Sequence, residues 1–264
     1  MAFNSSSESP NVPAGEKLRV ILVGVGGATS SGKTTLAKHL RSIIPGSVIL
    51  HQDDFAPPQE KIPIHPEYNV QDWDSAEGAI DWPRMVNALR EVKRTGKIPP
   101  EHYSHDHLNP QKDVSVDSET VQKWRETFTR IEEEHSRKGE HVVWILVDGF
   151  LLYWHPDVVS ALDVRIFLRV PEEVLKKRRE ERHGYHTAVQ SDMLEGALWR
   201  DPPHYWEQIV WPAYVAAHKD IFENGDVEHG KPNGKVPGLL VFDALETSVN
   251  DMIEKVCEIL VKVV

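Results

Sequence analysis

The sequence predicts an α/β protein, a three-layer sandwich in which a five-stranded, mainly parallel sheet lies between helices. Short runs rich in Val, Ile and Leu, typical of strands covered on both faces, alternate along the chain with longer amphipathic stretches. A Gly- and Ser-rich segment also lies directly between the first apolar run and the first amphipathic stretch. The expected strands are 18–23, 48–50, 142–147, 164–170 and 239–242.

The amphipathic stretches are expected to form the helices that cover this sheet. One begins after Gly32, and the next two carry apolar side chains on one helical face over 85–92 and 121–131. The last begins near Ser248 and closes the chain. Two segments rich in Gly, Pro and polar turn formers are expected to be long loops, 96–118 and 224–238.

Composition limits the classes of protein that this chain can belong to. It has 264 residues, 40% of them hydrophobic and 27% charged, as in an ordinary globular protein. We expect one domain over 17–264, after a disordered tail over 1–16. No apolar run approaches the roughly 20 residues of a membrane-spanning helix, so no membrane is expected. The net charge of −11 argues against a nucleic-acid partner.

The single cysteine, Cys257, rules out an intrachain disulfide and fits a reducing compartment. The first 16 residues lack the basic and apolar regions of a secretory signal. We therefore expect a cytoplasmic protein, with the nucleus as a second location. No pattern in the sequence indicates an oligomeric state.

The strongest motif is GATSSGKT at 27–34, which matches G-x-x-x-x-G-K-[ST] in full and lies between an expected strand and an expected helix. Such a loop directs backbone N–H groups at phosphate oxygens, beside the positive end of the helix. Lys33 is expected to reach the β- and γ-phosphates of ATP, Thr34 to bind Mg²⁺, and Thr35 to contact the α-phosphate. The expected ATP site is Gly27, Ala28, Thr29, Ser30, Ser31, Gly32, Lys33, Thr34 and Thr35. The alternative is a Gly- and Ser-rich turn without a ligand.

Carboxylates follow two of the expected strands. Asp53 and Asp54 come after 48–50, and Asp148 comes directly after 142–147. Ligands of open parallel sheets bind at the carboxyl edge, where these residues would meet. We expect Asp53 to be the catalytic base of a phosphoryl transfer and to contact Mg²⁺, Asp54 to support it, and Asp148 to bind Mg²⁺. Alternatively, these acids only form turns.

A helix rich in arginine is expected after the fourth strand, and 171–203 is the expected lid. Arg178, Arg179 and Arg182 would clamp the transferring phosphates and exclude water. The alternative is structural, because acids early and bases late in a helix also complement its dipole.

Together these segments resemble the nicotinamide riboside kinases of the uridine kinase-like P-loop group. The resembling pieces are 24–40, 47–55, 71–85, 147–153, 167–182 and 210–214. The resemblance implies phosphorylation of the ribose 5′-hydroxyl of nicotinamide riboside, and also of nicotinic acid riboside, in NAD salvage. ATP is the implied donor, Mg²⁺ the implied metal, and a small nucleoside the implied partner.

The resemblance also implies a nucleoside site. In it, Asp74 binds ribose hydroxyls, Trp73 stacks on the pyridinium ring, and Tyr185 supplies a second aromatic face. Arg179 lies on the substrate side, with Arg178 and Arg182 nearer ATP, and Asp53, Asp54 and Phe55 lie beside the substrate. Trp73 is the one tryptophan expected there; alternatively it is a buried residue at the start of a helix. Asp148 departs from the family, in which a Glu is usual.

Two other functions remain open. A uridine or cytidine kinase, or a kinase of another small molecule, would use the same scaffold with another substrate pocket. A regulatory protein that binds a nucleotide without transferring phosphate would need the loop at 27–34 but not the base at Asp53. His102, His105 and His107 are expected to be polar loop residues rather than a zinc site, because no cysteine lies near them.

Overall fold

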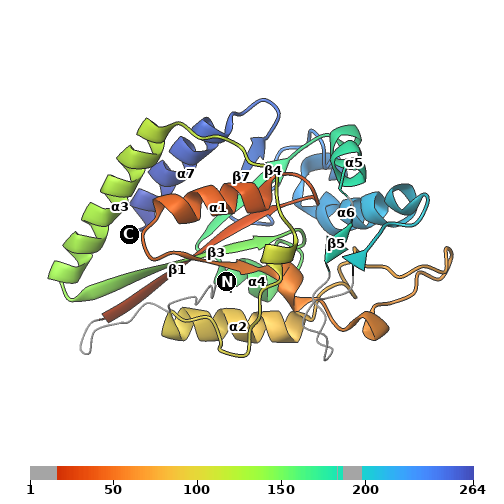
Figure 1. Ribbon diagram of the computed structural model, residues 1–264, viewed down its shortest axis with the longest axis horizontal. Helices are drawn as coiled ribbons and strands as arrows, with labels where there is room; N and C mark the ends of the chain where they lie inside the picture. The colour runs from red at the N-terminus through yellow and green to blue at the C-terminus, as the bar shows by residue number, and fades with distance from the viewer. Residues whose placement is uncertain (1–16, 183, 187–197) are drawn as a thin grey trace, which may run out of the picture.

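The computed structural model describes residues 17–182, 184–186 and 198–264, so the expected tail over 1–16 lies outside the described residues. Within these ranges the central sheet has five strands, all parallel, in the order β2-β3-β1-β4-β7 (Figure 1). They are β1 (Lys17–Gly27), β2 (Val48–His51), β3 (Glu140–Gly149), β4 (Val164–Arg169) and β7 (Leu239–Asp243). The five predicted strands and the α/β fold class are confirmed.

Strand β1 extends past its predicted end at residue 23, through glycines that usually weaken a strand. A Cβ atom on Gly26 would lie 2.4 Å from the ring of Tyr153, and one on Gly24 would lie 2.7 Å from Leu162. The Tyr153 hydroxyl bonds the carbonyl oxygens of Gly24 and Ile166 on adjacent strands. The glycines therefore make room for a buried tyrosine that ties β1 to β4.

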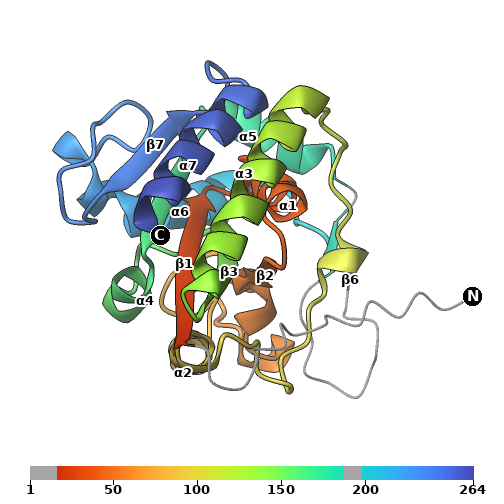
Figure 2. The same cartoon turned by 90° about the vertical axis from the view of Figure 1, so that its left-hand side faces the viewer.

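Helices cover both faces of the sheet. On one face α1, α3 and α7 pack side by side, and on the other lie α2, α4 and α6 (Figures 1 and 2). The helices of the described residues are α1 (Lys33–Ile43), α2 (Trp82–Thr95), α3 (Ser118–Arg137), α4 (Pro156–Ala161), α5 (Glu172–Glu180), α6 (Trp211–His218) and α7 (Val249–Val263). A π-helical turn, η4 (Trp206–Val210), precedes α6. As expected, Ser248 begins α7, because its side chain accepts a hydrogen bond from the Asp251 N–H.

Alternation along the strands divides the core into two parts. Val20 and Leu22 of β1 pack toward α2, whereas Ile21 and Val23 pack toward α1, α3 and α7. Because successive side chains of a strand point to opposite faces, an almost continuous apolar run can fill both layers. The continuous apolar runs that predict a sheet covered on both faces are therefore explained by the structure, in which both faces of β1 pack against helices.

The segment expected to be the lid contains α5 and a small antiparallel ribbon of β5 (Tyr185–His186) and β6 (Leu198–Trp199). Residues 183 and 187–197 of that segment lie outside the described residues. Between α2 and α3, the described residues form a loop with one 3₁₀ turn, Asp106–Leu108, and α3 begins at Ser118. No helix in the described part of the chain is long and apolar enough to cross a membrane.

Candidate active site

The loop between β1 and α1 has the backbone geometry that its sequence predicts. Gly27 has φ +136°, and a Cβ atom there would lie 2.3 Å from the carbonyl oxygen of Leu168. Gly32, with φ +99°, begins α1. Lys33 is buried, and its Nζ donates a 2.9 Å hydrogen bond to the carbonyl oxygen of Ala28, across the loop. Burial lowers the pKa of Lys33, and a phosphate would supply the negative charge that this ammonium group needs.

A cavity opens above this loop at the carboxyl edge of the sheet. Most of the expected site residues line it, although they come from five separate parts of the chain. They are Thr29, Ser30, Gly32, Lys33, Thr34, Thr35, Asp53, Trp73, Asp74, Asp148, Arg179, Arg182 and Tyr185. The parallel strands bring these segments together, because their carboxyl ends share one edge.

One end of the cavity holds a set of oxygen atoms that suits Mg²⁺. Asp148 Oδ2 accepts hydrogen bonds from the Thr34 hydroxyl and, at 3.1 Å, from His51 Nδ1. Burial alone would raise the pKa of Asp148, but His51 holds it below its ordinary value. Asp148 Oδ1 is buried and has no hydrogen-bond partner among the described residues. An ionised carboxylate with a free oxygen beside a hydroxyl is a ligand set that this hard cation prefers.

Burial by itself would lower the pKa of His51, but its bond to Asp148 raises that pKa to about 9. His51 is therefore protonated at neutral pH and compensates the buried charge of Asp148. In the described ranges, no group of three or more His, Cys, Asp or Glu side chains is placed to hold a metal ion. A magnesium site here would draw on two carboxylates at most, with hydroxyl and phosphate oxygens, as is usual for Mg²⁺.

Asp53 and Asp54 face in different directions because they belong to a 3₁₀ turn, Gln52–Phe55. The Asp53 carboxylate is exposed to the cavity, where desolvation by its surroundings and the charge of Asp148 raise its pKa to about 6. Asp54 is buried outside the cavity and accepts a 2.9 Å hydrogen bond from the backbone N–H of His105. Only Asp53 is thus placed to contact a ligand in the cavity.

Phe55 is also turned away from the cavity. It is 1% exposed and packs in the core, with the Arg84 guanidinium 5.1 Å from its ring centroid and the His102 ring at 5.0 Å. The expectation that Asp54 and Phe55 lie beside the substrate is therefore corrected. Both side chains point away from the cavity and support the Gln52–Phe55 turn that carries Asp53.

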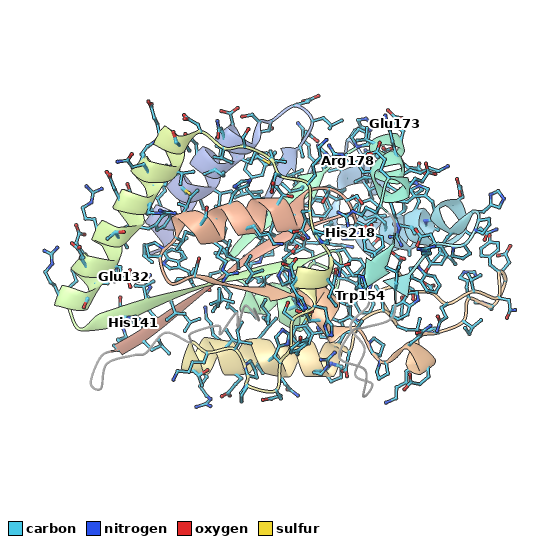
Figure 3. The ribbon with its side chains drawn as sticks, viewed as in Figure 1. Glu132, His141, Trp154, Glu173, Arg178 and His218 are labelled. Atoms are coloured by element: carbon cyan, nitrogen blue, oxygen red, sulfur yellow. The ribbon has the colours of Figure 1, made fainter. Side chains whose placement is uncertain are left out.

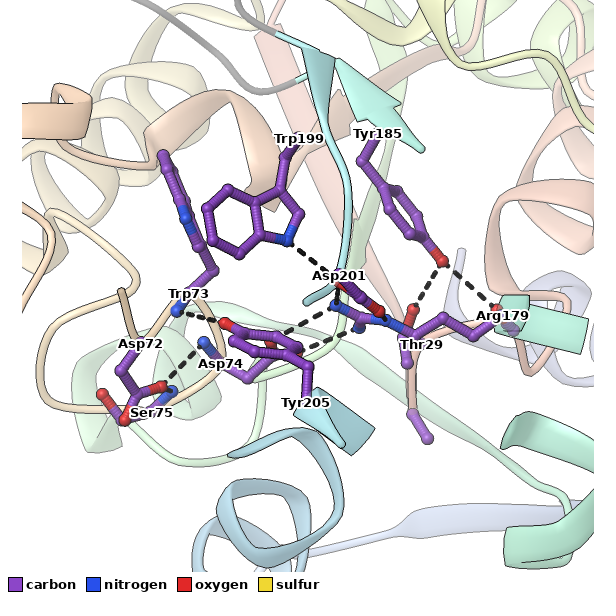
Figure 4. A network of polar contacts seen from close by, with 12 residues as sticks. Thr29, Asp72, Trp73, Asp74, Ser75, Arg179, Tyr185, Trp199, Asp201 and Tyr205 are labelled. Atoms are coloured by element: carbon purple, nitrogen blue, oxygen red, sulfur yellow. Dashed lines mark hydrogen bonds and ion pairs between the residues drawn. The ribbon is translucent and has the colours of Figure 1, made fainter. Parts of the chain in front are cut away.

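The opposite wall of the cavity is organised around Arg179 (Figure 4). Its Nη1 lies 3.2 Å from Asp74 Oδ1, and its Nε donates a 2.6 Å hydrogen bond to Asp201 Oδ2. Burial alone would lower the pKa of Arg179, but the two carboxylates raise it above its ordinary value. Its guanidinium carbon lies 5.0 Å from the ring centroid of Tyr185. Arg178, seen on α5 in Figure 3, donates instead to the Ser30 carbonyl oxygen at 3.3 Å.

Two tryptophans lie next to each other beside this network (Figure 4). The ring centroids of Trp73 and Trp199 are 5.7 Å apart with planes tilted by 53°, and both residues line the cavity. The Trp199 indole N–H donates to Asp201 at 2.9 Å. The Tyr205 hydroxyl accepts a hydrogen bond from the Trp73 backbone N–H at 3.1 Å. The Trp199 ring is thus held by its own hydrogen bond, whereas Trp73 is held through its backbone, and its indole N–H has no hydrogen-bond partner among the described residues.

Comparison with known proteins identifies the family. A nicotinamide riboside kinase from Saccharomyces cerevisiae is 36% identical over 211 residues, which cover 80% of this chain and 82% of the relative. Another, from Schizosaccharomyces pombe, is 34% identical and covers 79% of this chain and 84% of the relative. The chain belongs to the nicotinamide riboside kinase family.

No family model matches this kinase. Among solved structures, a sugar kinase from Janibacter sp. covers 92% of this chain and 95% of its own, with 18% identity and a TM-score of 0.41. The family assignment depends on the sequence relatives, and the resemblance to nicotinamide riboside kinases is confirmed by them.

The ring that contacts Trp73 in this structure is that of Trp199, and Tyr185, which the resemblance implies as the second aromatic face, also lines the cavity. The Tyr185 hydroxyl lies 3.3 Å from Thr29 Oγ1, at the phosphate loop. Trp199 and Asp201 were both missed by the sequence analysis. The segment that contains them, Trp-Arg-Asp-Pro-Pro, carries an aromatic and an acid after the arginine-rich helix, but nothing in it indicates which residues it meets.

Trp206 and Trp211 stack on each other with ring centroids 6.2 Å apart. His102 and His105, which the sequence predicts to be polar loop residues, contact the buried carboxylate of Asp54 at 3.5 Å. These two histidines are therefore part of the support behind the Asp53 turn.

Proposed function

We propose that this kinase transfers the γ-phosphate of ATP to the ribose 5′-hydroxyl of nicotinamide riboside, and also accepts nicotinic acid riboside, in NAD salvage. The relatives are named nicotinamide riboside kinases, and these names support nicotinamide riboside as the substrate. The observation that carries the proposal is that one cavity joins two unlike ends: the phosphate loop with Lys33 and Asp53, and the wall made by Asp74, Arg179 and the tryptophan pair. Such a cavity suits a donor phosphate at one end and a nucleoside at the other.

At the phosphate end, the backbone N–H groups of the loop and the Lys33 ammonium would bind the β- and γ-phosphates. Arg178 contacts the loop and Arg182 lines the cavity, so both can neutralise phosphate charge. Thr34 and Asp148 would hold Mg²⁺, with Asp53 in indirect contact. Bound Mg²⁺ supplies positive charge that stabilises the transferring phosphoryl group.

Asp53 would act as the base. It is the acid of its turn that faces the cavity, and a pKa of about 6 leaves it mostly ionised at neutral pH while keeping it a better proton acceptor than an ordinary aspartate. It would orient the 5′-hydroxyl toward the γ-phosphate and accept its proton as the phosphorus–oxygen bond forms. His51 and Asp54 would hold the neighbouring groups in place without touching the substrate.

At the nucleoside end, the Asp74 carboxylate and the Arg179 guanidinium would bind the ribose hydroxyls. Trp73 and Trp199 would enclose the pyridinium ring, because an aromatic face attracts a cation. A ring stacked between two others needs about 3.5 Å on each side. The outer rings must therefore lie about 7 Å apart, and because the tryptophan centroids are only 5.7 Å apart, the substrate has to turn or displace one indole on entry.

The direct test measures ADP release with Mg·ATP and one nucleoside at a time: nicotinamide riboside, nicotinic acid riboside, uridine or cytidine. Every product is confirmed by mass. Nicotinamide riboside is expected to give the highest kcat/KM and its mononucleotide as product. Faster phosphorylation of uridine or cytidine would show that the base pocket has been misassigned. If ATP binds but no nucleoside is phosphorylated, the protein would instead be a nucleotide-binding regulator.

A further inference from the structure

The loop between α2 and α3, residues 96–117, here called the strap, is tied to both catalytic segments of the chain. At one point the buried Asp54 carboxylate accepts the backbone N–H of His105. At another, the Asp106 carboxylate lies 2.7 Å from Lys38 Nζ, on α1 directly after the phosphate loop. In Figure 1 the strap passes α1 on its way from α2 to α3. It is therefore anchored to the Asp53 turn and to the helix of the phosphate loop.

From these anchors the strap reaches the ribbon that carries Tyr185. The Asn109 side-chain amide donates a 2.9 Å hydrogen bond to the carbonyl oxygen of His186 and accepts a 2.9 Å hydrogen bond from its N–H. A carboxamide presents one donor face and one acceptor, as a peptide group does. Asn109 thus occupies the place of a neighbouring strand along the edge of β5. Both β5 and β6 have only two residues, and so short a ribbon needs such support.

Strand β5 places Tyr185 where three groups of the proposed site meet. The ring has the guanidinium carbon of Arg179 at 5.0 Å from its centroid and that of Arg182 at 5.1 Å. The hydroxyl lies 3.3 Å from Thr29 Oγ1 on the phosphate loop. Gly184, before the strand, has φ +134°, and a Cβ atom there would lie 2.6 Å from the Trp199 carbonyl oxygen. The close pairing of the two strands therefore depends on glycine on one side, and β5 depends on Asn109 on the other.

We propose that Asn109 is a positioning residue for phosphoryl transfer: by clamping the backbone of His186 it holds Tyr185 against the phosphate loop and beside the two arginines. This inference rests on the proposed kinase function. When the clamp is lost, the arginines lose their alignment and water reaches the γ-phosphate more easily. ATP is then hydrolysed to ADP and inorganic phosphate without forming the nucleoside monophosphate.

The experiment compares Asn109→Ala and the isosteric Asn109→Asp, which can no longer donate to His186, with the wild-type enzyme. Asn233→Ala is the matched control, because Asn233 also donates to backbone carbonyls, of Asp220 at 2.9 Å and Phe222 at 3.3 Å, but lies outside the cavity. The readouts are kcat and KM for nicotinamide riboside, the ratio of ADP to mononucleotide formed, and the midpoint of thermal unfolding.

We expect both Asn109 variants to lower kcat about tenfold and to form ADP in excess of mononucleotide, with KM for the nucleoside nearly unchanged. The control should keep the wild-type kcat and a one-to-one product ratio. In a double-mutant cycle, Asn109→Ala combined with Tyr185→Phe should be no slower than the slower single variant. The inference is overturned if the Asn109 variants keep the wild-type kcat and product ratio, or lose only thermal stability. It is also overturned if the losses in kcat from Asn109→Ala and Tyr185→Phe are additive in the double variant. If the wild-type enzyme phosphorylates no nucleoside, the proposed function fails first and the inference fails with it.

Discussion

Arg179 and Asp74 are 105 residues apart in the chain and form an ion pair of 3.2 Å at the cavity wall. Both side chains are buried, and Asp201 binds the other edge of the same guanidinium. A buried charge is tolerated when it is paired, and removing one partner leaves the others uncompensated. The pair therefore ties α5 to the segment after β2 and presents charged groups to a ligand at the same time.

Replacing Arg179 by Lys should weaken both the link between α5 and the segment after β2 and the binding of the substrate. A lysine keeps the charge but lacks the planar fork that serves Asp74 and Asp201 together. We expect kcat/KM for nicotinamide riboside to fall about 100-fold and the free energy of unfolding to fall by about 3 kcal/mol. Steady-state kinetics and urea unfolding measure the two effects. Arg178→Lys is the control for stability, since Arg178 makes one 3.3 Å bond to a carbonyl oxygen; equal losses in both variants would contradict the special role of Arg179.

Replacing Asp53 by Asn should remove the proton acceptor while keeping the shape of the site. We expect kcat to fall by about 100-fold or more, with ATP binding within a factor of two of wild type. The raised pKa of Asp53 also means that its ionised form is unfavourable in the folded state. The amide variant should therefore have a higher unfolding midpoint than wild type at pH 7. Calorimetry and single-turnover kinetics test both effects, and a variant that keeps wild-type turnover would exclude Asp53 as the base.

The pH dependence of kcat/KM should follow the ionisation of Asp53. Asp53 accepts a proton only when ionised, and its pKa of about 6 lies above the ordinary value for an aspartate. The wild-type kcat/KM should therefore be constant above about pH 7 and fall below pH 6, approaching tenfold per pH unit. The residual activity of Asp53→Asn should lack this fall. A wild-type profile that is flat between pH 5 and pH 7 would rule out the assignment.

Removing the Trp199 indole should weaken binding of a charged base more than of a neutral one. Cation–π attraction contributes about 0.5–2 kcal/mol, which corresponds to a rise in KM of roughly 2- to 30-fold. We expect Trp199→Ala to raise KM for nicotinamide riboside within this range and KM for uridine less. Trp211→Phe, outside the cavity and stacked on Trp206, should leave both values unchanged. The prediction fails if Trp199→Ala changes the two substrates equally.

A methyl group at Gly27 should disrupt the phosphate loop. The added Cβ would lie 2.3 Å from a backbone carbonyl oxygen of β4, which cannot move without breaking the sheet, and φ is +136°. We expect Gly27→Ala to lower the free energy of unfolding by about 3 kcal/mol or more and to abolish ATP binding. Gly46→Ala is the control: its φ is also positive, but no atom lies within 4 Å of the added carbon, so a loss of about 1 kcal/mol is expected. Similar losses in the two variants would show that steric contact is unimportant.

The sequence alone predicted the sheet, the main helices and the phosphate loop, because each depends on a local pattern. An apolar run such as 142–147 indicates a buried strand from its own residues alone. Likewise, the glycines at 27 and 32 can adopt the backbone conformation of a tight turn because they lack a Cβ atom. The parallel topology then implied that Asp53 and Asp148 share one edge with Lys33.

Only the tertiary structure decided which side chains meet across that edge. It turned Asp53 into the cavity and Asp54 and Phe55 away from it, placed Trp199 opposite Trp73, and joined Asn109 to His186. Such contacts join residues far apart in the chain, and they depend on how layers pack and on which buried polar groups need partners. No periodicity or motif around either residue of such a pair contains that information.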